Sequence, residues 1–98
     1  MSILVRFAPT SMTTEQYEAV KRAVVGESDA PPDGAELHVC FGEEGRLRVS
    51  EVWASREQFD AFAQRLMPAI EAAGIEMSTP PEFFEVHNMM ISRTEAAA

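Results

Sequence analysis

The chain lacks what several classes of protein require. It has one cysteine, Cys40, so no disulfide can form within it, and this favours a reducing compartment. Lysine and arginine together number 8 against 16 acidic residues, which gives a formal charge of −8. Nucleic acids and anionic membranes attract cationic surfaces, so neither is an expected partner. No stretch approaches the roughly 20 apolar residues that span a bilayer.

The remaining composition is that of an ordered soluble protein, with 46% hydrophobic and 24% charged residues. Its 98 residues predict one domain at 1–91, followed by a flexible C-terminal tail at 92–98. A chain this short buries only roughly 60–65% of its unfolded surface, so association would add stability. Arg6 and Pro9 interrupt the first apolar run, which excludes a secretory signal there. We therefore expect a cytoplasmic protein.

Apolar and polar residues alternate in three stretches that we interpret as strands. The first is 3–7, the second is 37–41, and the third is 46–53, which follows a hairpin turn at 42–45 that contains two glycines. A fourth strand is expected at 83–91. The third strand carries Leu47, Val49, Glu51 and Trp53 on one face, because successive side chains point to opposite sides.

Two segments have the sequence of a helix start. Thr13-Thr14-Glu15-Gln16 fits a capping box and opens a helix that runs to about Val25. Ser55-Arg56-Glu57-Gln58 fits a second one and opens a longer helix that ends before Gly74. Pro68 falls inside this second helix, so we expect it to kink the helix or to restart it.

The order β-α-β-β-α-β predicts an α+β, ferredoxin-like fold: a four-stranded antiparallel sheet with both helices on one face. The expected strand order is fourth, first, third, second. The open face should carry Leu4, Arg6, His38, Cys40, Arg48, Ser50 and Val52. Such a mixed face is too apolar for water and too polar for a core. We therefore expect a homodimer in which two sheets pack face to face.

Glu51 is the strongest candidate for a catalytic residue, because a carboxylate on a covered strand face is paired, hydrogen-bonded or functional. In a half-enclosed cavity its pKa would rise by desolvation, and it could act as a base. The alternative interpretation is structural, with Glu51 bonded to a backbone amide or paired with Arg6 or Arg48. Trp53 either packs against the second helix or forms a flat wall for a ligand.

The element order, the segment Glu51 to Phe59 and the closing Val86-His87-Asn88 resemble the dimeric α+β-barrel superfamily. Within it, the chain is most similar to small proteins close to the antibiotic-biosynthesis monooxygenases. The resemblance implies a homodimeric barrel with a small-molecule cavity between sheet and helices. Several such relatives oxidise aromatic polyketides without metal or flavin. Others degrade haem through a histidine on the second helix, which residues 55–73 lack.

His38 and His87 are the only histidines, and we place them on opposite edge strands. No third ligand with suitable spacing accompanies them, so no metal site is expected. Together with Arg6 and Asn88 they are candidates for polar contacts at the dimer seam. His38 and Cys40 share a strand face, and a thiol near an imidazole can become a nucleophile, but a packed thiol is the default.

These features predict a cofactor-independent monooxygenase that acts on a small aromatic or polyketide-like molecule. Glu51 would abstract a proton, and the resulting carbanion would itself reduce dioxygen. Tyr17, Trp53, Phe59 and Phe62 would shape the pocket. One alternative is an isomerase or cyclase, since proton abstraction is also their first step. The other is a non-catalytic small-molecule-binding or structural dimer whose interior is filled by Trp53, Phe62 and Met67.

Overall fold

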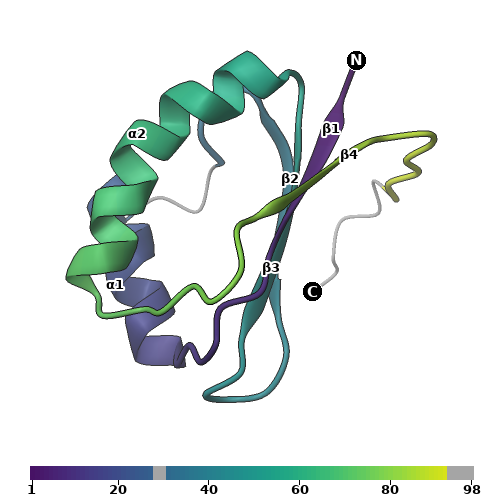
Figure 1. Ribbon diagram of the computed structural model, residues 1–98. Coiled ribbons are helices and arrows are strands. Elements are labelled where there is room, and N and C mark those ends of the chain that lie inside the picture. Colours follow the sequence, from purple (N-terminus) through teal and green to yellow (C-terminus); the bar gives the residue numbers. More distant parts are fainter. Residues whose placement is uncertain (28–30, 93–98) are drawn as a thin grey trace.

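Four antiparallel strands form one sheet, and two helices cover a single face of it (Figure 1). The computed structural model describes residues 1–27 and 31–92. The elements are β1 (Ile3–Phe7), α1 (Thr14–Val25), β2 (Ala35–Phe41), β3 (Arg48–Trp53), α2 (Arg56–Ala72) and β4 (Glu82–Glu85). The strand order is β2-β3-β1-β4. Both the ferredoxin-like fold and this strand order confirm the predictions from the sequence.

The start of α1 is fixed by the predicted capping box. The Thr13 hydroxyl accepts from the Gln16 amide at 3.1 Å, and the Gln16 side chain accepts from the Thr13 amide at 3.0 Å. Ser55 caps α2 by accepting from the Gln58 amide at 3.2 Å. Helix α2 continues through Pro68 without a restart. Both helices therefore begin where the sequence predicts.

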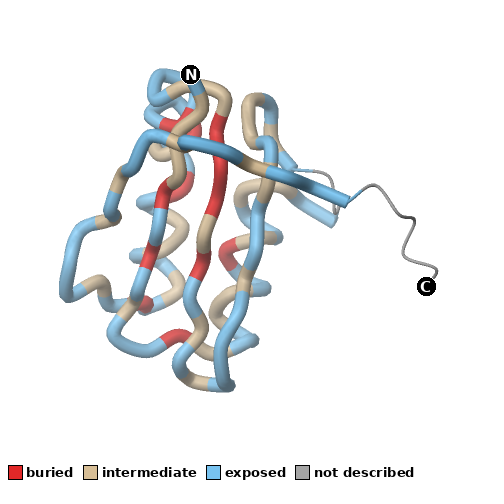
Figure 2. The backbone as a smooth tube through the Cα atoms, turned by 90° about the vertical axis from the view of Figure 1, so that its right-hand side faces the viewer, coloured by how far each residue is buried: buried red, intermediate tan, exposed pale blue. Residues whose placement is uncertain are grey.

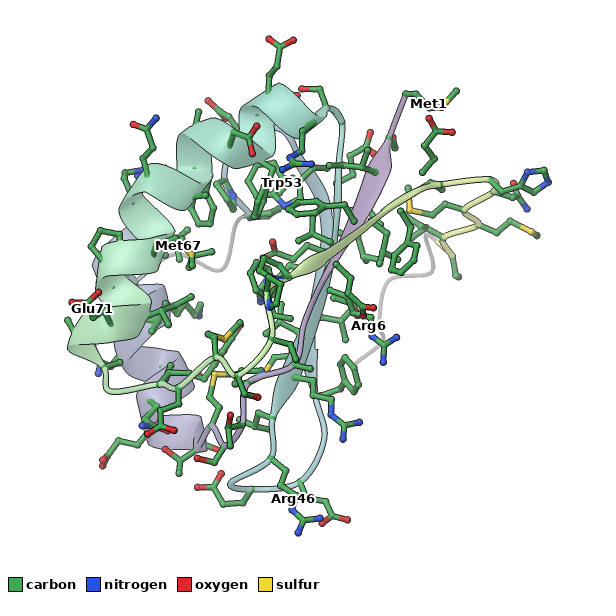
Figure 3. All side chains as sticks on the ribbon, in the orientation of Figure 1. Met1, Arg6, Arg46, Trp53, Met67 and Glu71 are labelled. Carbon is green, nitrogen blue, oxygen red and sulfur yellow. The ribbon has the colours of Figure 1, made fainter. Side chains whose placement is uncertain are left out.

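The core lies between the sheet and the helices, and Figure 2 shows buried segments in red along the central strands. Trp53 is fully buried there, and its indole packs against the rings of Phe59 and Phe62 at centroid distances of 5.7 and 5.3 Å. Figure 3 shows Trp53 between the sheet and α2, whereas Arg6 points away from the helices. Clustered aromatic rings of this kind anchor α2 on the central strands.

The last strand is shorter than the predicted 83–91. β4 pairs with β1 from Arg6↔Glu82 to Ile3↔Glu85, and β1 begins at Ile3, so the ladder has no further strand to pair with. One more bond joins the Val86 amide to the Ser2 carbonyl at 3.0 Å. Beyond it the chain extends away from the helices (Figure 1). Of the predicted tail at 92–98, residues 93–98 lie outside the described part of the chain.

The register between β2 and β3 overturns the predicted faces of β2. His38 is opposite Glu51 and Cys40 is opposite Val49, so both face the helices. Val39 and Phe41 lie on the other face, where they are 41% and 39% exposed. The prediction was wrong because it turned the more apolar side of β2 inward. The register of the hairpin determines instead which side chains of β2 face the helices, because residues directly opposite in an antiparallel pair share a face.

Candidate functional site

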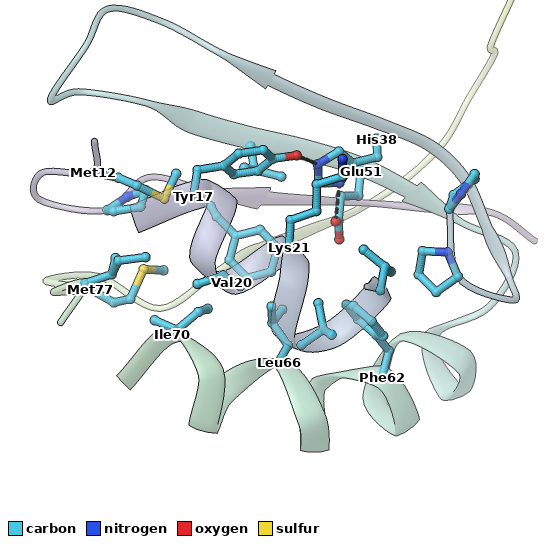
Figure 4. Close-up of a pocket in the computed structure, with 18 of the residues that line it drawn as sticks. Met12, Tyr17, Val20, Lys21, His38, Glu51, Phe62, Leu66, Ile70 and Met77 are labelled. Atoms are coloured by element: carbon cyan, nitrogen blue, oxygen red, sulfur yellow. Dashed lines mark hydrogen bonds and ion pairs between the residues drawn. The ribbon is translucent and has the colours of Figure 1, made fainter. Parts of the chain in front are cut away.

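Four side chains from three elements form one hydrogen-bonded series, here called the polar chain: Tyr17, His38, Glu51 and Trp53. The Tyr17 hydroxyl lies 2.6 Å from His38 Nε2, and His38 Nδ1 lies 2.7 Å from Glu51 Oε2. Trp53 Nε1 donates to Glu51 Oε1 at 2.9 Å. Figure 4 shows the first three converging between α1 and the sheet.

The strand geometry explains why these residues meet. Glu51 and Trp53 are two residues apart on β3, so both point toward the helices. His38 is the direct register partner of Glu51 on the neighbouring strand. Tyr17 reaches the same place from α1, and its ring stacks on the His38 ring at a centroid distance of 5.9 Å.

The chemistry of the four side chains determines which group donates and which accepts in each bond of the polar chain. An indole N–H can only donate, and an ionised carboxylate can only accept. The Glu51 carboxylate therefore accepts from Trp53 at one oxygen and from the His38 Nδ1–H at the other. With Nδ1 protonated in neutral His38, Nε2 accepts from the Tyr17 hydroxyl. Glu51 is 6% exposed, so these bonds satisfy a carboxylate inside the protein.

A pocket of about 370 Å³ opens beside the polar chain (Figure 4). Its wall is mostly apolar, from Phe7, Pro9, Met12, Val20, Val24, Val25, Pro31, Pro32, Leu37, Val49, Phe62, Leu66, Ile70, Ile75 and Met77. The polar side chains at the wall are Tyr17, Lys21, Glu36, His38 and Glu51. An apolar hollow with a few polar groups is the usual form of a small-molecule site.

The predicted pocket residues divide into two layers. Tyr17 and Phe62 line the pocket, as does Glu51. Trp53 and Phe59 do not line it: they lie behind the wall, where both are buried and packed edge to face. Trp53 is therefore connected to the pocket wall through its bond to Glu51.

The four residues expected at a dimer seam do not lie together in the structure. His38 belongs to the polar chain on the helix side, which corrects its predicted position on the open face. Arg6 is on the open face, and its guanidinium lies 4.0 Å from the Glu82 carboxylate, so it does not pair with Glu51. His87 and Asn88 are exposed beyond β4.

Sequence reasoning missed the bond between His38 and Glu51, although the chain contains a signal for it. The hairpin turn at 42–45 brings β3 back along β2. Counting outward from that turn pairs an even-numbered residue of β2 with an odd-numbered residue of β3. The hydrophobic pattern of β2 pointed the other way and concealed this pairing.

Cys40 packs against the core beside α1. Burial raises the pKa of its thiol, and the negative charge of Glu18 raises it further. Both effects disfavour the thiolate, so the predicted default of a packed, unreactive thiol fits its surroundings.

Within residues 1–27 and 31–92, no three His, Cys, Asp or Glu side chains gather as they would around a metal ion. None of the helices described there has the length and apolar character needed to cross a membrane.

Comparison with known proteins identifies the fold. No family model and no curated protein matches the sequence. A candidate antibiotic biosynthesis monooxygenase from Chloroflexus aurantiacus J-10-fl superimposes with a TM-score of 0.60 at 17% identity, over 94% of this chain and 100% of that one. The cofactor-independent oxygenase SnoaB from Streptomyces nogalater gives 0.59 at 14%, over 93% and 96%.

A third solved structure, Rv0793 from Mycobacterium tuberculosis, gives a TM-score of 0.53 at 17% identity, over 93% of this chain and 96% of that one. The predicted resemblance to antibiotic-biosynthesis-monooxygenase-like proteins is thus confirmed at the level of the fold. Identities this low carry no activity or substrate from one protein to another.

Proposed function

We propose that the protein is a cofactor-independent monooxygenase that acts on a small aromatic or polyketide-like molecule by base-assisted proton abstraction. One observation carries the proposal: the buried Glu51 carboxylate reaches the wall of a mostly apolar pocket of about 370 Å³. The fold adds support, since one solved protein that shares it is a cofactor-independent oxygenase.

The chemistry requires three things of the protein. An acidic C–H of the ligand must lose its proton to the hydrogen-bonded group built on Glu51. The carbanion then bonds to dioxygen, and the peroxide anion takes up a proton. Loss of water leaves a carbonyl, so one oxygen atom enters the product and the other leaves as water. An apolar pocket excludes solvent that would otherwise protonate the carbanion first.

We also propose that the protein acts as a homodimer through the open face of the sheet. This face carries Leu4, Val39, Phe41 and Phe84 alongside Arg6, Arg48, Ser50 and Glu82. Phe84 is 50% exposed in the single chain. A stable interface buries roughly 800 Å² on each partner, and a four-stranded sheet face with this much apolar surface is suited to that role.

Oxygen uptake with anthrone, a tricyclic ketone that has an acidic methylene, tests the proposed activity. We expect uptake above the uncatalysed rate, with label from isotopically heavy dioxygen in the quinone product. Glu51→Gln should lower the rate roughly 100-fold or more, because general-base catalysis by the group that Glu51 holds together usually contributes that much. The matched control is Glu71→Gln, an exposed glutamate on α2.

Two results would contradict the proposal. An unaltered oxidation rate in Glu51→Gln would remove the carboxylate from the mechanism. Anthrone that is bound or isomerised without oxygen uptake would favour the binding protein or the isomerase over the monooxygenase.

A further inference from the structure

We propose that His38 is the residue of the polar chain that accepts the ligand's proton, by way of the Tyr17 hydroxyl, and that Glu51 is its positioning residue. The inference deepens the proposed function, on which it rests for the presence of an acidic ligand. It assigns a different role to each of Tyr17, His38 and Glu51, which meet at the wall of the pocket.

The Glu51 carboxylate is enclosed by its hydrogen-bond donors. Its two oxygens already accept from Trp53 and His38 at 2.9 and 2.7 Å. Its side chain is 8% exposed, whereas that of His38 is 34% exposed. A ligand proton that went directly to the carboxylate would compete with two donors held in place by the core. Of the two bases, the His38 imidazole is the more accessible.

The bonds of the polar chain all run in one direction. With the indole and Nδ1–H both donating to Glu51, neutral His38 presents its Nε2 lone pair to Tyr17. Each donor in the series therefore points toward the carboxylate. A carboxylate that fixes the tautomer of a basic histidine, and that stabilises the imidazolium without becoming protonated, is the arrangement of the serine-protease triad.

The proton step can be written in full. The ligand O–H or C–H bond breaks, and its electron pair stays on the ligand. The proton bonds to Tyr17 Oη while the original hydroxyl proton moves to His38 Nε2. The products are a ligand anion and an imidazolium beside the Glu51 carboxylate. Because His38 is partly exposed, the imidazolium can then return the proton to water.

The tautomer of His38 is the first test, and it needs no ligand. Nitrogen chemical shifts of ¹⁵N-labelled protein distinguish Nδ1–H from Nε2–H in neutral imidazoles, and exposed His87 is the internal reference. We expect the Nδ1–H form at His38. In Glu51→Gln the new amide can donate to Nδ1, so the Nε2–H form should increase at His38 but not at His87. Wild-type protein in the Nε2–H form would overturn the inference.

Ionisation of a bound phenol is the second test. 7-Hydroxycoumarin has separate absorption bands for phenol and phenolate, so it reports proton transfer without turnover. At a pH where the free dye is mostly protonated, wild-type protein should hold it as phenolate. His38→Gln and Glu51→Gln should remove the phenolate band. Tyr17→Phe, which keeps the ring, should reduce the band at least tenfold while circular dichroism shows an intact fold.

His87→Gln and Glu71→Gln are the matched controls, and neither should change the band. Wild-type protein that binds the dye in its neutral form, or that fails to bind it, overturns proton acceptance by His38. Failure of the proposed function looks different. In that case the His38 tautomer and the phenolate band appear as expected, but anthrone is not oxidised.

Discussion

The indole of Trp53 donates to the carboxylate of Glu51, two residues earlier on the same strand, at 2.9 Å. Trp53 has no exposed surface and is fixed by Phe59 and Phe62. The bond therefore connects the aromatic core to the polar wall of the pocket. A carboxylate held in this way has little freedom to turn, which fits a residue that positions another.

Loss of the Glu51 carboxylate should destabilise the fold. Glu51→Ala leaves the Trp53 and His38 donors without an acceptor inside the protein, so we expect a loss of about 3 kcal/mol in the free energy of unfolding. Glu51→Gln keeps one acceptor oxygen and should cost about 1 kcal/mol. Urea denaturation measures both. Glu71→Ala, on the exposed side of α2, should change stability by less than about 0.5 kcal/mol. Equal effects at both positions would contradict this account.

The start of α1 should be sensitive to acid through Glu44. This carboxylate accepts from the Thr14 amide at 2.8 Å and from the Thr14 hydroxyl at 2.5 Å, and these bonds hold its pKa below the ordinary value. A carboxylate with a lowered pKa adds stability above its unfolded pKa, and this stability is lost as the pH falls through the folded pKa.

The test compares wild-type protein with Glu44→Gln by urea denaturation across the acid range. The wild-type protein should be more stable at neutral pH, and the difference should disappear as Glu44 becomes protonated. Glu43→Gln, which changes the neighbouring carboxylate, is the control. A difference that stays constant down to the lowest pH would show that the charge of Glu44 does not stabilise the helix.

Cys40 should react slowly with iodoacetamide in the folded protein. Burial and the charge of Glu18 raise its pKa, so less thiolate is present at any pH below that value. Mass spectrometry should show slower alkylation than in urea-unfolded protein, with the rate profile displaced to higher pH. Because the raised pKa favours the protonated thiol, its contribution to stability is lost as the pH rises through the folded pKa. Glu18→Gln should move the profile part of the way back.

The open face can be tested through Phe84, which is half exposed on β4. Light scattering should report a dimer for the wild-type protein. Phe84→Glu would place a charge in the proposed interface and should produce monomers at the same concentration. Met67→Glu is the matched control, because Met67 is exposed on α2 at 42%. A monomeric wild-type protein would refute the interface.

The sequence was sufficient to predict the fold, since the Thr13 capping box, the glycine hairpin and the strand order are all local or topological signals. It also predicted that the Glu51 carboxylate lies on a covered face of β3, because a carboxylate among apolar neighbours stands out. Which face of the sheet His38 lies on depends on how β2 pairs with β3, and the hydrophobic periodicity of one strand cannot reveal that pairing. Whether Trp53 lines a pocket or lies behind it depends on how α1 and α2 pack, and no single segment encodes this.

Strand β2 lies at the edge of the sheet, next to β3. Its outward side, with Val39 and Phe41, is more hydrophobic than its inward side. A one-residue slip of the strand would turn these side chains toward the helices and bury more apolar surface than the native register does. The imidazole–carboxylate bond opposes that slip, which makes β2 a site of local frustration in the folding landscape. Under the proposed function, the same bond would therefore hold both the polar chain and the register of the hairpin.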